Sequence, residues 1–498
     1  MTVHQDLTAP GEAGHAPAAV TLDLFIDGAW LPPSSGRRFD VVNPVDAQVM
    51  ASAALASVAE AARAVEAADR AFGTWSRTTG DERAKVLRAA AAAVSARSEE
   101  LATILTREHG KPLADARKEI KAAIDTFDFY AEEARRIGGE LAPSRSRTAR
   151  SLVLRQPVGV VAAITPWNYP VSLMAWKLGP ALAAGCTVVV KPPSAAPVAC
   201  AIVAGIVGEI APRGVVNVVT GEASVVGDEL VRNPLTRMIA FTGSTATGQE
   251  LMRAAAADLK HVLLELGGQT PFVVFKDADL DLAVKDGVKR AFRNNGQICN
   301  AVNRIYVEEE VAAEYVDRFV KETASITIGD GLANPTVDLG PMIDQKGLDR
   351  TQRHVDDAVA KGATVLCGGG RAAVPGSPDG FFFQPTVLTN VTPDMLVMHE
   401  ETFGPAVGIA TFKGLDDAVS LANSTEFGLV TYAYTSDLRT AFGFGERVES
   451  GTVAINTVSP DSLLAPYPAW KHSGIGLELG HQGLEEYLQV KHLLLELV

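Results

Sequence analysis

Cysteine is scarce in this chain, and the scarcity limits what its thiols can do. Only four occur in 498 residues, at positions 186, 200, 299 and 367, and no two are spaced as C-x-x-C. So few thiols exclude a disulfide-stapled scaffold and indicate reduced cysteines. Cys186, Cys200 and Cys367 stand in apolar or glycine-rich runs, which favours buried, inert thiols. Only Cys299, in "NNGQICNAVNR", has polar neighbours on both sides, and it has no histidine or second cysteine close by.

Positive charge and long apolar runs are also lacking. Lysine and arginine number 45 against 59 aspartates and glutamates, and the net charge of −14 opposes bulk attraction to nucleic acid or anionic membrane. The longest apolar run, residues 198–208, is too short for the roughly 20 residues of a spanning helix. Residues 1–20 lack the basic and apolar regions of a signal peptide, so we expect a flexible tail and a cytoplasmic protein. We expect no metal site, and small molecules as partners.

What the chain has is the composition of a globular protein, with 47% hydrophobic and 21% charged residues, and a length typical of two or three domains. Helical spacing of apolar residues predicts amphipathic helices over residues 57–120. Short β-branched runs then alternate with helical segments, which predicts an α/β fold with a parallel, doubly wound sheet. These runs are residues 158–165, 187–192, 215–221 and 238–244.

A second α/β series begins near residue 271. It comprises an expected strand at 271–275, a helix at 279–295 and a further strand at 303–309, after Cys299. The chain ends in the apolar run "YLQVKHLLLELV", which is hard to leave in water. Packing on the chain's own core and packing in a subunit interface are both open interpretations of that run.

Two glycine-containing turns follow expected strands. "FTGSTATG" (241–248) opens a helix, so its backbone N–H groups are able to hold a pyrophosphate, although a structural turn is the alternative. Gln249 and Glu250 stand where an ATP-binding P-loop needs lysine and serine or threonine, so that interpretation fails. "ELGG" places Glu265 at the end of an apolar strand, where burial would raise its pKa and make it a usable base, unless it is simply solvated.

A third turn, "TPWNYP" (165–170), ends another expected strand. It presents Asn168, a side chain able to stabilise an oxyanion, between prolines that stiffen the loop; a plain turn is the alternative.

Together these motifs stand in an order that resembles the aldehyde dehydrogenase superfamily. The resemblance runs from "DLFIDGAWLPPSSGRRFDVVNP" to the C-terminal strand and includes "TPWNYP", "ALAAGCTVVVKPPS", "FTGSTATG", "ELGG", "NGQICN" and "EETFGP". It implies a Rossmann-like cofactor domain (21–140 and 159–266), an α/β catalytic domain (267–456) and a small β oligomerisation domain (141–158 and 480–498). It also implies a homodimer or homotetramer.

The resemblance assigns the chemistry. Cys299 is the nucleophile that attacks the aldehyde, and Asn168 with the backbone N–H of Cys299 holds the oxyanion. Hydride then leaves for the nicotinamide, and Glu265 activates the water that hydrolyses the thioester. A covalent thiol adduct supplies the tetrahedral centre that hydride departure requires. We expect the oxyanion hole and the cofactor to favour the thiolate of Cys299 without a histidine.

The resemblance also gives a set of cofactor contacts. Lys191 is expected at the adenosine ribose, Gly243 and Ser244 at the pyrophosphate, and Glu401 at the nicotinamide ribose with Phe403 beside it. The remaining cofactor-binding positions are Thr165, Pro166, Trp167, Ser194 and Gly221. Members that prefer NAD carry a glutamate where this chain has Ser194, and a carboxylate there would repel a 2′-phosphate. We therefore expect NAD(P)+ as cofactor, with NADP+ favoured and dual use open.

The substrate pocket departs from its nearest likeness, the succinate-semialdehyde dehydrogenase branch. Trp176 replaces one arginine of that branch, whereas Arg293, six residues before the nucleophile, is kept. Ile298 adjoins the nucleophile, and Asp461 aligns with a serine. The usual "PFGG" is "PYPA" in residues 466–469. We expect these changes to favour a neutral aromatic or aliphatic aldehyde, or an aminoaldehyde, over succinate semialdehyde.

Other functions remain open at this stage. They are a succinate-semialdehyde dehydrogenase, a CoA-acylating semialdehyde dehydrogenase, a cysteine hydrolase and a catalytically silent relative. Glu265 favours water over CoA as the acyl acceptor, and the joint presence of Asn168, Glu265, Cys299 and Glu401 argues against a silent protein.

Overall fold

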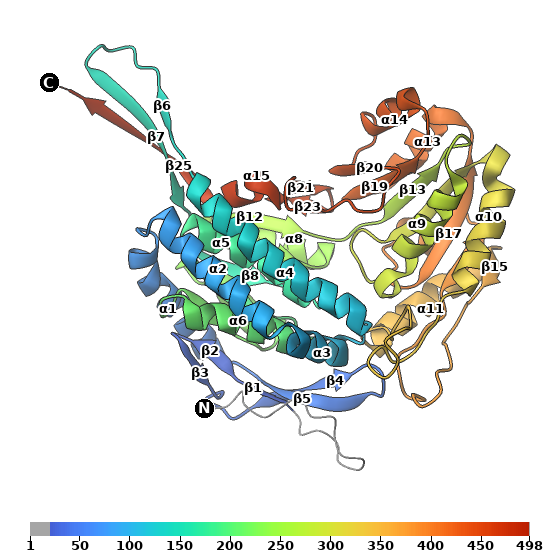
Figure 1. Cartoon of the computed structure of the whole chain (residues 1–498), viewed down its shortest axis with the longest axis horizontal. Helices are drawn as coiled ribbons and strands as arrows, with labels where there is room; N and C mark the ends of the chain where they lie inside the picture. The colour runs from blue at the N-terminus through green and yellow to red at the C-terminus, as the bar shows by residue number, and fades with distance from the viewer. Residues whose placement is uncertain (1–19, 498) are drawn as a thin grey trace.

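The computed structural model describes residues 20–497, and Figure 1 shows two α/β bodies side by side with a narrow antiparallel sheet projecting from one of them. The expected flexible tail, residues 1–20, lies outside the described residues except for Val20, which begins strand β1. Within the described residues no helix is both long and apolar enough to cross a membrane.

The first body is built on an eight-stranded sheet of order β23-β12-β11-β8-β9-β10-β2-β3. Its five central strands are parallel and include all four runs expected from the sequence. They are β8 (Val160–Ile164), β9 (Thr187–Lys191), β10 (Val216–Val218), β11 (Thr236–Thr242) and β12 (His261–Glu265). The edge strands are β3 (Ala29–Leu31) and β23 (Gly474–Ile475), and β2 (Leu24–Ile26) lies between β10 and β3. The predicted Rossmann-like fold is confirmed.

The helices of this body follow the apolar periodicity. They are α1 (Val58–Trp75), α2 (Gly80–Ala96), α3 (Ser98–His109), α4 (Leu113–Glu133), α5 (Pro170–Ala184), α6 (Val198–Ile210), α7 (Asp228–Arg232) and α8 (Thr245–Ala255). Capping boxes fix two of the starts, since Ser57 pairs with Glu60 and Thr79 with Glu82. The chain leaves helical geometry at Arg97, which separates α2 from α3.

The second body holds a seven-stranded sheet of order β15-β16-β17-β14-β13-β19-β20, parallel except for the edge strand β15. The strands are β13 (Thr270–Val274), β14 (Val302–Glu308), β15 (Thr364–Cys367), β16 (Thr386–Thr389), β17 (Ala406–Phe412), β19 (Val430–Tyr434) and β20 (Thr452–Ile455). The helices are α9 (Leu280–Phe292), α10 (Glu309–Ala324), α11 (Gln345–Ala360), α12 (Leu396–His399), α13 (Gly414–Asn423) and α14 (Leu438–Gly445).

The projecting sheet has the order β25-β7-β6, with β6 (Glu140–Ala142), β7 (Ala149–Pro157) and β25 (Leu488–Glu496) all antiparallel. It extends away from both bodies (Figure 1), and Val490 and Leu494 on β25 are 59% and 60% exposed. The C-terminal apolar run therefore packs in the chain's own core only at its start, where Tyr487 is buried, and not from Val490 onwards. Its role in oligomerisation stays a prediction.

Smaller elements complete the chain. They are β1 (Val20–Leu22), β4 (Arg38–Asn43), β5 (Gln48–Ala54), β18 (Phe427–Gly428), β21 (Tyr467–Pro468), β22 (Trp470–Lys471), β24 (Leu477–Glu478) and α15 (Gly480–Glu485). Residues 457–479, which the expected domain division leaves unassigned, return from the second body to the first, where β23 pairs with β12.

Candidate active site

Cys299 lies in a tight loop between α9 and β14. Three consecutive residues of this loop have positive φ: 52° at Asn294, 57° at Asn295 and 68° at Gly296. This left-handed backbone favours glycine and asparagine, which explains the composition of "NNGQ". The side chains hold the loop in place: Asn295 Nδ2 donates to the carbonyls of Gly340 and Pro341, both at 3.0 Å. The polar residues beside the thiol are therefore its scaffold.

The second glycine of "ELGG" makes room for this loop. A Cβ on Gly268 would lie 2.1 Å from the carbonyl oxygen of Cys299. Glu265, three residues earlier, ends β12, so the same turn brings the base and the nucleophile together.

Asn168 follows β8 and reaches the nucleophile loop. Its Nδ2 donates to the carbonyl of Gln297 at 3.0 Å, and its own carbonyl accepts a hydrogen bond from Lys111 Nζ at 2.7 Å. Lys111 is fully buried and paired with Glu119, whose Oε1 accepts the N–H of Val171 at 2.9 Å. The sequence motifs did not reveal this buried pair, because its members lie about 50 residues before Asn168, Lys111 in the loop between α3 and α4 and Glu119 on α4.

Burial, and next the nearby Glu478 carboxylate, raise the pKa of Glu265 to about 8. Both of its Oε atoms are buried and without a hydrogen bond of ordinary geometry among the described residues, but the carboxyl lies close enough to the Cys299 thiol for each group to shift the pKa of the other. The expectation that burial would raise the pKa of this carboxyl is confirmed. A base with unsatisfied oxygens facing the reaction centre is suited to accept a proton from water.

We expected the thiolate form of Cys299 to be favoured. The protein's own groups favour the protonated thiol instead. Burial, and next the Glu265 carboxylate, raise the pKa of the Cys299 thiol well above its usual range. Arg290 opposes this effect but does not overcome it. In the protein alone the thiol therefore keeps its proton, and the thiolate requires a further positive charge or loss of that proton as the adduct forms.

Two cavities meet at the catalytic residues, and Cys299 and Asn168 line both. The first cavity has a volume of about 180 Å³ and lies at the carboxyl ends of the parallel strands of the first body. It brings together three short stretches of chain and four single residues. They are residues 166–168, 242–244 and 265–267, with Cys299, Arg350, Glu401 and Phe403.

Glu401 and Phe403 form one wall of this first cavity. Glu401 Oε1 accepts the N–H of Gly268 at 2.9 Å, and burial raises the pKa of its carboxyl to about 7. The ring of Phe403 meets that of Trp167 edge to face at 5.3 Å. Arg350, which the sequence motifs did not reveal, donates to the carbonyls of Thr402 and Phe403 at 2.8 and 3.2 Å and so fixes this wall.

Gly243 and Ser244 form the opposite end, where β11 passes into α8. Ser244 caps α8, its Oγ accepting the N–H of Thr247 at 3.3 Å. The first turn of a helix leaves N–H groups free and carries a partial positive charge, which suits a pyrophosphate. A carboxylate for ribose hydroxyls, aromatic side chains and this helix terminus together fit a nicotinamide dinucleotide.

Four expected cofactor residues form a separate group beyond this cavity, at the ends of β8, β9 and β10. Thr165 Oγ1 donates to the carbonyl of Lys191 at 3.4 Å, and Ser194 Oγ to that of Gly221 at 3.4 Å. Burial lowers the pKa of Lys191 to about 8, and Nζ contacts only the Pro192 carbonyl, at 3.5 Å, within the described chain. In open α/β sheets this edge is where a dinucleotide lies.

The second cavity, of about 130 Å³, lies on the other side of Cys299 and collects all four expected substrate residues, Trp176, Arg293, Ile298 and Asp461. Trp176 meets Tyr467 edge to face at 6.0 Å. Tyr467 comes from the unusual "PYPA" segment, which forms strand β21 and turns this ring into the wall.

Arg290 also lines the second cavity, and the motifs missed it. It donates through Nε to Tyr432 Oη at 2.8 Å and through Nη2 to Asn300 Oδ1. Burial alone would lower its pKa, but Tyr432 and Asp461 hold it above its ordinary value. Arg290 lies one helical turn before Arg293 at the end of α9, and that i, i+3 spacing is the signal that would have found it.

A dinucleotide crevice, a half-buried thiol beside it and a buried carboxyl opposite define a class: nicotinamide-dependent dehydrogenases that work through a covalent cysteine adduct. Comparison with known proteins gives the family. The aldehyde dehydrogenase family matches residues 30–493, so the chain belongs to it and is an NAD(P)-dependent aldehyde dehydrogenase.

Among its relatives is succinate-semialdehyde dehydrogenase [NADP(+)] of Escherichia coli strain K12, 43% identical over 475 residues, 94% of this chain and 96% of the relative. Glutarate-semialdehyde dehydrogenase of Pseudomonas aeruginosa is 43% identical over 472 residues, 95% of this chain and 97% of the relative. A crystal structure of Staphylococcus aureus betaine aldehyde dehydrogenase with NAD+ superimposes with a TM-score of 0.93 at 34% identity, covering 97% of each chain.

Proposed function

We propose that this enzyme oxidises its aldehyde to the carboxylic acid by the hydrolytic route. The Cys299 thiol loses its proton to solvent as Sγ bonds to the aldehyde carbon, and the oxygen, now negatively charged, is held by Asn168 Nδ2 and the N–H of Cys299. NAD(P)+ would be held in the first cavity by Glu401, Phe403 and the first turn of α8, where it would supply the acceptor for the hydride that this carbon loses. The resulting thioester is attacked by water, whose proton passes to Glu265. The shared position of Cys299 and Asn168 between the two cavities is the observation that carries this proposal.

Water as the acyl acceptor, in place of CoA, rests on Glu265. Its carboxyl is buried and unpartnered in the first cavity, with a pKa near 8. A thiol acceptor needs no such base. A cysteine hydrolase has no use for the dinucleotide crevice, and oxidation of an aldehyde with cofactor reduction separates the two activities.

For the substrate, we propose an aldehyde with an uncharged aromatic or medium-chain tail. Trp176 and Tyr467 give the second cavity an aromatic wall, and Leu173 and Ile298 add apolar surface. Its charges are of both signs. Asp461 opposes a carboxylate, whereas Arg290 and Arg293 oppose the ammonium of an aminoaldehyde. A neutral tail avoids both penalties, so the aminoaldehyde is less favoured than the motifs alone suggested.

A semialdehyde with a carboxylate tail is the second candidate, and Arg290 is the observation in its favour. Two guanidinium groups, those of Arg290 and Arg293, line the cavity, whereas the sequence motifs gave only Arg293. Nε of Arg293 is buried and has no hydrogen-bond partner among the described residues, and its ion pair with Asp115 Oδ1 is long, at 3.9 Å, so a closer anion could compete for it. The relatives from Escherichia coli and Pseudomonas aeruginosa are named for semialdehydes of this kind.

Measuring kcat/KM for a set of aldehydes tests both substrate candidates. We expect higher kcat/KM for benzaldehyde-type or medium-chain aldehydes than for succinate or glutarate semialdehyde or an aminoaldehyde. A wild-type preference for succinate semialdehyde that disappears in Arg293→Ala and Arg290→Gln would establish the second candidate instead.

For the cofactor, we propose that NADP+ is preferred and NAD+ is also used. Ser194 is exposed and places no carboxylate near the Lys191 ammonium, so a 2′-phosphate meets attraction without repulsion. We also expect a cytoplasmic homodimer or homotetramer, assembled through the exposed sheet of β6, β7 and β25.

A further inference from the structure

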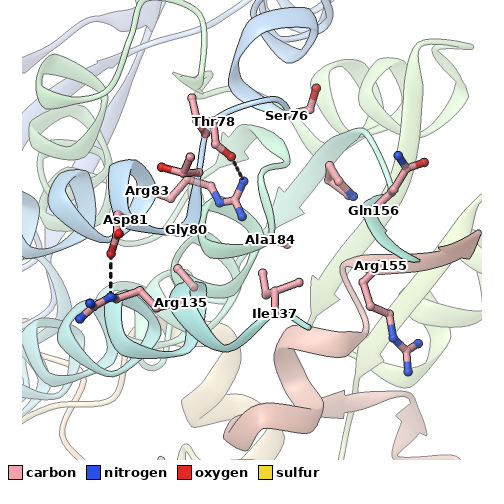
Figure 2. Close-up of a pocket in the computed structure, with 13 residues that line it drawn as sticks. Ser76, Thr78, Gly80, Asp81, Arg83, Arg135, Ile137, Arg155, Gln156 and Ala184 are labelled. Atoms are coloured by element: carbon pink, nitrogen blue, oxygen red, sulfur yellow. Dashed lines mark hydrogen bonds and ion pairs between the residues drawn. The ribbon is translucent and has the colours of Figure 1, made fainter. Parts of the chain in front are cut away.

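A cavity of about 520 Å³ lies away from the active site, at the base of the projecting sheet. Figure 2 shows it between the start of α2, the end of α4 and the last residues of β7. Its charged lining comprises Arg83, Arg135, Arg155 and Asp81. Its other lining residues are polar and small apolar side chains, with no aromatic ring among them. Three guanidinium groups against one carboxylate make its lining positive.

Arg83 is the residue that points to a ligand. It is 7% exposed, and Figure 2 shows its guanidinium directed into the space between Thr78 and Ala184. Its Nη1 donates to the Thr78 carbonyl at 2.7 Å, but its Nε is buried with no hydrogen-bond partner among the described residues. It also forms no ion pair with any described carboxylate, although burying an uncompensated charge is costly.

The neighbouring charges are already engaged. Arg135 pairs with Asp81 at 2.7 Å, and Arg155 is 3.7 Å from Glu485. Glu82, next to Arg83, is held in the capping box by Thr79. Glu82 partly offsets the burial that lowers the pKa of Arg83, but no described carboxylate forms an ion pair with its guanidinium.

The start of α2 faces the same cavity. Thr79, Gly80 and Asp81 line it, and the first N–H groups of a helix have no acceptor within the helix. A buried guanidinium beside a helix N-terminus is the combination that binds phosphate oxygens.

We propose that this cavity binds a small phosphorylated metabolite, with its phosphate at Arg83 and the first turn of α2 and its polar remainder towards Arg155 and Gln156. The volume exceeds that of a lone phosphate and falls in the range of small-molecule sites. The absence of an aromatic ring from the lining disfavours a nucleobase, which needs a stacking partner. A bound ligand joins α2 to β7 and so stabilises the base of the projecting sheet.

The test uses the full-length protein saturated with NADP+, so that the dinucleotide site is closed to added phosphate. Inorganic phosphate and glycerol 3-phosphate are titrated at constant ionic strength by calorimetry, with glycerol as the uncharged control. We expect saturable binding of both phosphates, tighter for glycerol 3-phosphate, with a rise in Tm. Binding of phosphate alone identifies the free anion as the ligand and overturns the metabolite.

Arg83→Gln should weaken binding roughly ten- to hundredfold, the effect of losing a charged hydrogen-bond donor. Arg155→Gln, on β7, should weaken glycerol 3-phosphate binding without disturbing α2, and it keeps the test open if Arg83→Gln does not fold. Arg88→Gln is the matched control, because Arg88 lies on α2 outside the cavity and pairs with Glu132. The proposal is overturned if the wild type binds neither phosphate compound, or if all three variants bind them equally well. It is also overturned if a partner subunit occupies the cavity.

Discussion

The two cavities beside Cys299 differ in how their residues are distributed along the chain. The cofactor side is made from consecutive residues at the carboxyl ends of strands, such as 166–168, 242–244 and 265–267. The substrate side draws more on single side chains spaced along helices, such as 118, 119 and 122 on α4, 172, 173 and 176 on α5, and 290 on α9. Contiguous motifs reveal the first kind of site. On the substrate side they gave Trp176, Arg293, Ile298 and Asp461 but missed Arg290.

The largest effect is expected at the residue that the two cavities share. Cys299→Ala should lower turnover by about a thousandfold or more, because no other group can form the covalent adduct. Affinity for the cofactor should change little, since the dinucleotide is held by the other residues of the first cavity. Steady-state cofactor reduction and a fluorescence titration with NADP+ measure the two quantities. Undiminished turnover would remove Cys299 from the mechanism.

Glu265→Gln separates the two chemical stages on the cofactor side. We expect about one reduced cofactor per active site in a rapid burst, followed by steady-state turnover lowered roughly a hundredfold or more, because only the water step needs the base. Stopped-flow absorbance resolves the two phases. If the burst disappears together with turnover, Glu265 acts before hydride transfer.

Much of the fold was predictable because it follows local patterns. The alternation of β-branched runs and helical segments gave the first parallel sheet and two strands of the second, and the capping boxes at Ser57 and Thr79 mark where helices begin. The catalytic residues stood in contiguous motifs. Lys111, Glu119 and Arg290 could not be found that way, because each acts through a tertiary contact with a segment far along the chain. The raised pKa of the Cys299 thiol likewise depends on tertiary surroundings, since burial and Glu265 cause it.

Ser194→Glu tests how the adenosine end of the cofactor side distinguishes NADP+ from NAD+. A carboxylate there should lower kcat/KM with NADP+ roughly ten- to hundredfold, by repelling the 2′-phosphate. The value with NAD+ should stay equal or rise, because a carboxylate accepts hydrogen bonds from ribose hydroxyls. Ser194→Gln is the matched control, of similar size but without charge. Equal losses with both cofactors would show that Ser194 does not discriminate between them.

The pH dependence of thioester hydrolysis follows from the raised pKa of Glu265. The carboxylate is the active base, and it is present above its pKa of about 8 and lost as the pH falls through that value. Hydrolysis should therefore slow about tenfold for each pH unit below 7.5 or so. Single-turnover acid release, measured between pH 6 and 9, gives this profile, and Glu265→Gln should flatten it. A wild-type profile that is flat over this range would assign the base to another group.

The smallest effect is expected at Trp176 on the substrate side, because this residue takes no part in the chemical steps. Trp176→Arg replaces an aromatic wall with a third guanidinium near Arg290 and Arg293, so it should raise kcat/KM for succinate semialdehyde relative to an aromatic aldehyde by about three- to tenfold. The change is modest because Asp461 remains at the cavity and opposes a carboxylate. Trp176→Phe, which keeps the apolar wall, should leave the ratio nearly unchanged. Asp461→Asn combined with Trp176→Arg should move the ratio further in the same direction, because it removes the opposing charge. If Trp176→Phe and Trp176→Arg shift the ratio equally, the wall acts through its shape alone, and charge in this cavity does not select the substrate.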